Sequence, residues 1–275
     1  MTPRVLSLSH LSALHLSPPE LIDCAASGGF DAVGIRVAQG ERDRGFLLPA
    51  GSALLRDTAS ALAHNGIRVL DVEVVKLHPG SSEGDWSAIV EAGAELGAKH
   101  LLVTVLDDDR SRAIDNFDLL SELSGAYGLR CCLEPMIFSS VRDFTAAAAF
   151  VAEARGSDSG VLVDALHWIR AGSELADLDA VDENSLPYWQ ICDAASAEPS
   201  DDLNAAITEA RTDRLPPGLG AFPLADLVHA LPSTAAVSVE VPSARSAADT
   251  RAWIAELGRA TRKVLDDAES DKLET

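Results

Sequence analysis

The chain has 275 residues, which fits one α/β barrel, and 47% of them are hydrophobic, enough for a full-sized core. Charged residues make up 24%, as in ordinary soluble domains, which excludes a disordered or membrane-embedded chain. The net charge is −21, from 43 acidic and 22 basic residues, so we expect neither nucleic acid nor a membrane as a partner.

Short β-branched runs alternate with longer runs rich in alanine and leucine. In the first half, strands are predicted over residues 4–9, 30–37, 67–77 and 100–106. Helices are predicted over residues 18–27, 53–64, 85–96 and 111–127. Prolines open the first helix, and Asn65-Gly66 ends the second.

The alternation continues to the C-terminus. Strands are predicted over residues 129–134, 160–164, 187–193 and 236–241. Helices are predicted over 141–154, near 173–178, near 224–231 and over 247–266, with a long loop before the third of these. The charged end after about residue 267 is expected to fray.

This order gives eight strand–helix units without a linker or a break in composition. Such alternation is typical of a parallel sheet. No GxGxxG follows the first strand, so a single (β/α)₈ TIM barrel over residues 1–275 is favoured over an open, doubly wound sheet, which remains the structural alternative.

The four cysteines and the N-terminus indicate the cellular compartment of the protein. Cys24, Cys131, Cys132 and Cys192 form no CxxC pair, so we interpret them as reduced, small apolar residues. The N-terminus lacks the basic, apolar and small-residue order of a signal peptide, and no apolar run approaches 18 residues. We therefore expect a cytoplasmic protein.

Oxygen-bearing side chains end four consecutive predicted strands. These are Glu134, Asp164, Gln190 and Glu240, and each follows apolar residues. In a parallel barrel the carboxyl ends of the strands meet at one face, where chemistry takes place. We therefore expect these four side chains to lie together.

A divalent cation is the simplest reason for such a cluster. An acid that ends a buried strand loses its hydration, and proteins tolerate this loss when the charge is paired or bound to a cation. Three carboxylates and one amide oxygen suit Mg²⁺, Mn²⁺ or Co²⁺. The alternative is that each acid caps the next helix or pairs with an arginine.

At these residues the sequence resembles the xylose isomerase-like barrel superfamily of sugar-phosphate isomerases and epimerases. The resemblance covers nearly the whole chain and is carried by five segments: LEPM (133–136), VDALHWIRAG (163–172), QICDA (190–194), EARTDRLPPGLGAFPL (209–224) and VSVEVP (237–242). It implies the same metal ligands, and it adds His167 through the family's Asp-x-x-His pattern.

Two departures from the family pattern matter. Gln190 stands where many sugar epimerases have histidine, which is similar to the 3-dehydroshikimate dehydratase branch. The DNA-repair branch binds three zinc ions through many histidines. This chain has seven histidines in all, and its charge of −21 also opposes DNA binding.

Three functions follow from this ligand set. The leading one is a metal-dependent isomerase or epimerase that abstracts a proton beside the carbonyl of a small sugar or cyclitol, with Glu134 and Glu240 as acid and base. The second is a dehydratase of the 3-dehydroshikimate type, with His167 as acid and base. The third is a barrel that only binds a ligand, which the four filled ligand positions argue against.

Four further residues are candidates for binding substrate. His10 lies at the mouth of the first strand, and Lys76 ends the third, where it could meet a carboxylate or phosphate. The resemblance adds Arg211 and Arg214, which match the family's arginine- and glycine-containing loop before the last strand. The sequence names no substrate, and it is compatible with a homo-oligomer.

Overall fold

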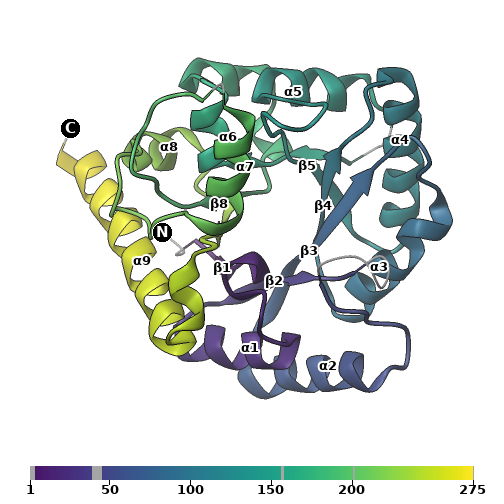
Figure 1. The fold of residues 1–275 in the computed structure, drawn as a ribbon, viewed down its shortest axis with the longest axis horizontal. Helices are drawn as coiled ribbons and strands as arrows, with labels where there is room; N and C mark the ends of the chain where they lie inside the picture. The colour runs from purple at the N-terminus through teal and green to yellow at the C-terminus, as the bar shows by residue number, and fades with distance from the viewer. Residues whose placement is uncertain (1–3, 39–44, 156–157, 201, 275) are drawn as a thin grey trace.

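A ring of parallel strands forms the centre of the molecule, and helices surround it (Figure 1). The computed structural model describes residues 4–38, 45–155, 158–200 and 202–274. The strands are β1 (Leu6–Leu8), β2 (Ala32–Arg36), β3 (Arg68–Leu77), β4 (His100–Val105), β5 (Arg130–Leu133), β6 (Gly160–Val161), β7 (Val163–Asp164), β8 (Tyr188–Ile191) and β9 (Ala236–Val239).

The ring closes at the sixth strand position. β6 pairs with β5, β7 pairs with β8, and only Leu162 separates them. The predicted strand over residues 160–164 is therefore one strand interrupted at a single residue, and it joins both ends of the sheet order β6-β5-β4-β3-β2-β1-β9-β8-β7. The predicted (β/α)₈ barrel is confirmed.

Helices follow the strands as the sequence indicates. They are α1 (Pro18–Ser27), α2 (Ala53–Asn65), α3 (Glu83–Glu95), α4 (Arg110–Ala126), α5 (Phe144–Glu153), α6 (Ala165–Arg170), α7 (Leu203–Thr212), α8 (Leu224–Ala230) and α9 (Thr250–Glu274). Short 3₁₀ turns are η1 (His10–Ala13), η2 (Leu175–Ala180), η3 (Glu183–Ser185) and η4 (Ala244–Ala247).

Local chemistry sets several of these boundaries. The Ser52 hydroxyl accepts a hydrogen bond from Leu55 N at the start of α2, and Gly66 ends the helix with a φ of 66°. Pro18 opens α1 as predicted, because its missing N–H would have no partner in the first turn.

Three helical segments differ from the sequence prediction. α6 begins directly after β7, and α7 occupies part of the predicted long loop. α9 continues to Glu274 rather than ending near residue 266. Ala268 is buried and its carbonyl accepts a hydrogen bond from His229 Nε2, which ties this part of α9 to α8.

The main core lies between the strands and the helices, and it includes Leu6, Leu8, Val33 and Ile35. A smaller apolar cluster lies inside the barrel. Polar residues occupy the carboxyl ends of the strands, which is the face where barrel enzymes carry their active sites. All four cysteines are free and buried. Within the described residues, no helix combines the length and the apolar character needed to cross a bilayer.

Candidate metal centre and catalytic cavity

Three carboxylates converge at the carboxyl end of the barrel. Glu134 directly follows β5, Asp164 ends β7 and Glu240 directly follows β9. Each can offer a carboxylate oxygen that lies within 4.8 Å of the other two, and all three side chains are buried. The parallel strands therefore bring together three of the four residues that the sequence selects as ligands.

Gln190 supplies the fourth oxygen. Its Nε2 donates a hydrogen bond to Glu240 Oε1 at 2.9 Å, which fixes the amide beside the carboxylates. Its Oε1 is fully buried and has no hydrogen-bond partner. A buried amide oxygen without a partner is costly, and three carboxylates with one amide oxygen form a hard donor set. The residues present therefore fit a divalent cation.

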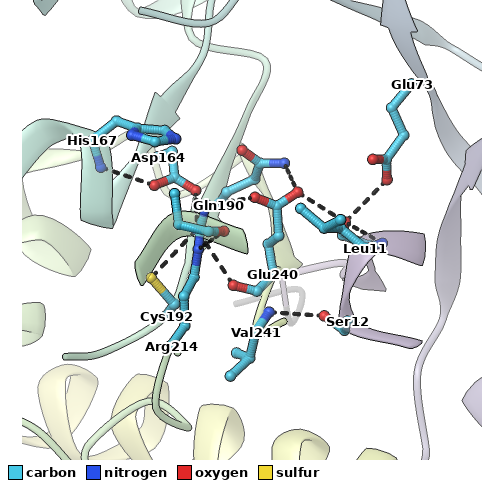
Figure 2. A network of polar contacts seen from close by, with 12 residues as sticks. Leu11, Ser12, Glu73, Asp164, His167, Gln190, Cys192, Arg214, Glu240 and Val241 are labelled. Atoms are coloured by element: carbon cyan, nitrogen blue, oxygen red, sulfur yellow. Dashed lines mark hydrogen bonds and ion pairs between the residues drawn. The ribbon is translucent and has the colours of Figure 1, made fainter. Parts of the chain in front are cut away.

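Arg214 lies against the carboxylate cluster, with its buried guanidinium directed at Asp164 and Glu240 (Figure 2). Its Nη1 is 2.6 Å from Asp164 Oδ2, and its Nη2 is 3.0 Å from Glu240 Oε2. Both terminal nitrogens of the guanidinium, Nη1 and Nη2, are therefore used in these ion pairs. Arg214 was expected to hold substrate, but the structure places it as a partner of two candidate ligands.

Backbone pairing explains this position of Arg214. Its N–H donates to Pro242 O at 3.1 Å, and the residues on either side form isolated bridges, Asp213 with Ser243 and Leu215 with Asp193. The segment is therefore drawn in against β8 and the end of β9.

Asp193 fastens the rest of this segment. Its carboxylate accepts hydrogen bonds from Ala194 N at 2.9 Å and from Gly218 N and Phe222 N, both at 3.0 Å. A Cβ at Gly220 would collide with Asp193 Oδ1 and Ala194 O, so this position requires glycine.

The crowded carboxylates have strongly perturbed pKa values. Burial, reinforced by Glu240 and Asp164, raises the pKa of Glu134 well above its ordinary value. Burial also raises the pKa of Glu240 to about 7, against the opposing effect of Arg214. Burial opposes ionisation of Asp164 as well, but Arg214 and His167 outweigh it and lower its pKa. A bound cation would stabilise all three charged forms.

His167 lies on α6 beside this cluster. The Asp164 carboxylate accepts a hydrogen bond from His167 N at 3.0 Å and so caps the helix that carries the imidazole. The imidazole ring is buried and lies edge-on to the Phe138 ring, with 5.3 Å between the two ring centroids. It also lines the cavity that is described below. Burial lowers its pKa to about 4, so the neutral imidazole that can accept a proton prevails near neutral pH.

A cavity of about 320 Å³ opens above the cluster. Glu134, Glu240 and His167 line it, as do Lys76 and Arg211. The structure thus places these five predicted residues around one space. Arg214 also borders it, but with its guanidinium committed to Asp164 and Glu240.

His10 does not line this cavity. Its ring is fully buried and stacks on the Phe46 ring, with 5.3 Å between the two ring centroids. Nε2 donates a hydrogen bond to Leu16 O at 2.9 Å, and Nδ1 accepts one from Arg36 N at 3.1 Å. Both ring nitrogens are used by the backbone. The structure therefore gives His10 a supporting role behind β2 instead of the expected contact with substrate.

Two polar residues at this face, Ser9 and Arg36, were not predicted from the sequence. Arg36 ends β2 and pairs with Glu73 Oε2 at 2.9 Å, and both line the cavity. Ser9 Oγ lies 3.0 Å from Glu73 Oε1 and 2.9 Å from Glu240 Oε1. The strand-end rule that selected Glu134 also applies to Ser9 and Arg36, so a signal for these two was present.

The closed parallel barrel with buried carboxylates at its carboxyl face defines an enzyme-like (β/α)₈ protein with a metal-competent site. The sequence of residues 22–263 matches the family described as xylose isomerase-like TIM barrel. The chain belongs to this family, as the resemblance in its motifs indicated.

Solved structures share the whole fold. The IOLI protein with a bound zinc atom is 21% identical with a TM-score of 0.77, over 96% of this chain and 98% of that one. A D-psicose 3-epimerase with D-fructose is 15% identical with a TM-score of 0.70, over 94% and 99%. The probable 3-DHS dehydratase AsbF from Bacillus anthracis is 11% identical with a TM-score of 0.71, over 94% and 98%. No curated protein matches the chain significantly.

Proposed function

We propose that the protein is a divalent-metal-dependent isomerase or epimerase that moves a proton next to the carbonyl of a small sugar-like substrate. One observation carries this proposal: three buried carboxylates within 4.8 Å of one another lie beside the unpartnered amide oxygen of Gln190. Membership of a largely enzymatic family supports it, and all four ligand positions are filled, which argues against a barrel that only binds a ligand.

Glu134, Asp164, Gln190 and Glu240 would hold the cation. When bound, a divalent ion polarises a carbonyl oxygen and stabilises the negative charge that develops on it. Mg²⁺, Mn²⁺ and Co²⁺ suit these oxygen donors, and the zinc atom in the IOLI structure adds Zn²⁺ to the candidates.

Proton transfer is assigned to the residues that line the cavity. Glu134 and Glu240 border it from β5 and β9, so a substrate between them would meet a carboxylate on two sides. One carboxylate would remove the proton beside the carbonyl and the other would return one. Ser9, which lies within 2.9 Å of Glu240 Oε1, orients this carboxylate.

A dehydratase is the second candidate, and the position of His167 favours it. The imidazole lines the cavity, is neutral near pH 7 and is not in the carboxylate cluster. It would remove a proton and return it to the departing hydroxyl, while the oxygen ligands keep the ion. The probable 3-DHS dehydratase among the structural neighbours is named for this type of reaction.

Replacing His167 with alanine distinguishes the two reactions. If a dehydratase reaction uses His167, the variant keeps its metal and loses about 10² to 10⁴ in kcat, the usual contribution of an acid–base group. If the two glutamates shuttle the proton, kcat changes little and KM rises. The assay is steady-state kinetics on an identified substrate, with metal content measured in parallel. Loss of metal in His167→Ala would contradict both assignments.

A further inference from the structure

A row of polar side chains lies inside the barrel below Glu240. Along β1, β9 and β8, both chain neighbours of Ser7, of Ser238 and of Gln190 belong to the main core outside the ring, so these three side chains point inward. They are also adjacent in register, because Ser7 pairs with Ser238 and Ser238 pairs with Gln190. Branched apolar residues usually fill the interior of such a barrel, so this polar row calls for a physical reason.

Asp71 joins this row from β3 by reaching in front of β2. Both chain neighbours of Gly34 on β2 belong to the main core, so Gly34 faces inward. A Cβ on Gly34 would lie 3.0 Å from Asp71 Oδ1, so the missing side chain leaves room for this carboxylate. The next strand beyond β2 is β1, which brings the carboxylate to the part of the interior that Ser7 and Ser238 border.

Four buried polar atoms of this region have no hydrogen-bond partner among the described residues. They are Ser7 Oγ, Asp71 Oδ1, Tyr188 Oη and Ser238 Oγ, and each of these residues is at most 1% exposed. Burial, and next the charge of Asp71, raise the pKa of Tyr188, as expected for a phenol near that carboxylate. A buried polar atom without a partner is costly, so a single group that bonds to all four would remove a large penalty.

Asp71 also stands apart from the other interior carboxylates in its charge balance. Glu73 pairs with Arg36, and Arg214 serves the carboxylates of the ligand cluster. In the described part of the chain, Asp71 forms no ion pair. A carboxylate at this depth is tolerated when a cation or a proton compensates its charge.

We propose that Asp71, Ser7, Ser238 and Tyr188 form a second, buried site that binds a monovalent cation, Na⁺ or K⁺. One carboxylate and three hydroxyl oxygens are hard donors with a total charge of −1. A monovalent ion neutralises this charge, whereas a divalent ion would leave buried positive charge without a partner. The ion joins β1, β3, β8 and β9 below the ligand cluster. The site uses none of the four divalent ligands, so it does not depend on the proposed function.

Thermal unfolding in different salts tests this site. The Tm of the full chain is measured in the chlorides of Na⁺, K⁺ and tetramethylammonium at equal ionic strength, which keeps the screening of surface charge the same. Tetramethylammonium is too large for a buried site. Each series is run in EDTA and again in saturating Mn²⁺. Asp71→Asn removes the charge and Ser7→Ala removes one hydroxyl, while Ser124→Ala, at a buried serine on α4 outside the barrel, is the matched control.

Na⁺ or K⁺ is expected to raise the Tm by about 3 °C for each tenfold increase in concentration above its Kd, because the ion binds only the folded chain. Asp71→Asn should abolish the difference from tetramethylammonium and Ser7→Ala should reduce it, while Ser124→Ala should keep it, with or without Mn²⁺.

Equal Tm values in all three salts would overturn the inference, and a proton on Asp71 would then compensate its charge. A difference that Mn²⁺ removes would also overturn it, because the monovalent ion would then occupy the divalent site. The same holds for a difference that is undiminished in Asp71→Asn. If Asp71→Asn does not fold, an undiminished difference in Ser7→Ala is the contradicting result.

Discussion

Arg214 shows how one side chain can join the candidate metal ligands into a unit. Its guanidinium bridges Asp164 and Glu240, and it is only 2% exposed. A buried ion pair contributes little by itself, but removing one partner leaves buried charge without compensation. Arg214 therefore orients both carboxylates when the ion is absent, and it favours their ionised forms against the effect of burial.

We expect Arg214→Gln to destabilise the metal-free protein by about 3–5 kcal/mol, the usual cost of breaking a buried pair. Mn²⁺ would neutralise the same carboxylates, so its addition should raise the Tm of the variant more than that of the unmodified chain. Thermal unfolding in EDTA and in excess Mn²⁺ measures both effects, with Arg259→Gln, at an exposed arginine on α9, as the control. An unchanged Tm in EDTA would show that Arg214 does not stabilise the cluster.

At the scale of elements, the loop between α7 and α8 depends on Asp193. This carboxylate accepts hydrogen bonds from three backbone N–H groups, two of them those of residues 218 and 222, and Arg214 lies near the start of the same loop. Losing the carboxylate would leave these buried or partly buried donors without partners, at about 1–3 kcal/mol each.

Asp193→Ala should therefore loosen residues 213–222 and weaken Mn²⁺ binding through Arg214, whereas Asp193→Asn, which keeps one acceptor oxygen, should show a smaller effect. Hydrogen exchange at the amides of Gly218 and Phe222 measures how often the loop opens, and calorimetry measures the Mn²⁺ affinity. Asp226→Ala, an exposed acid on the adjacent α8, is the matched control. Unchanged exchange in Asp193→Ala would mean that the loop is held by other contacts.

The same elements show what the sequence could predict. The alternation of strands and helices gave the barrel, and the strand-end rule gave Glu134, Asp164, Gln190 and Glu240, because position along a parallel strand fixes the face of the barrel. α7 was missed although Asp202 precedes it as an N-cap that accepts from Asn204 N and Ala205 N. Its polar surroundings in the sequence hid this signal.

The side-chain orientations of His10 and Arg214 could not be predicted from the sequence. His10 is turned away by Leu16 O and Arg36 N, and Arg214 is drawn inward by Pro242 O and two carboxylates. Most of these partners are distant in the chain, so no local pattern encodes them. Residue position was predictable, but side-chain orientation needed the fold.

At the scale of the whole molecule, the stability of the folded chain should depend on pH, and metal binding should change that dependence. The pKa of Glu240 is about 7 in the folded chain, raised mainly by burial from an ordinary 4.5. Between these values the folded state holds a proton that the unfolded state has released. The resulting stability is full below pH 4.5 and is lost as the pH rises through about 7.

The Tm of the metal-free protein should therefore fall between pH 5 and pH 8, and Mn²⁺ should remove most of this fall, because it takes the place of the proton. The measurement is thermal unfolding at both pH values, with EDTA or Mn²⁺. In Glu240→Gln, which cannot ionise, the dependence in EDTA should be shallower. A steeper fall in that variant than in the unmodified chain would contradict the assignment.

We propose that Glu134, Asp164, Gln190 and Glu240 hold one divalent ion. Calorimetric titration of Mn²⁺ into the EDTA-treated full chain, with metal analysis of the loaded protein, tests it most directly. We expect one ion per chain and a loss of affinity of at least tenfold in Glu134→Gln. Glu91→Gln, at an exposed glutamate on α3, should keep the original affinity. No bound ion, or undiminished affinity in Glu134→Gln, would contradict it.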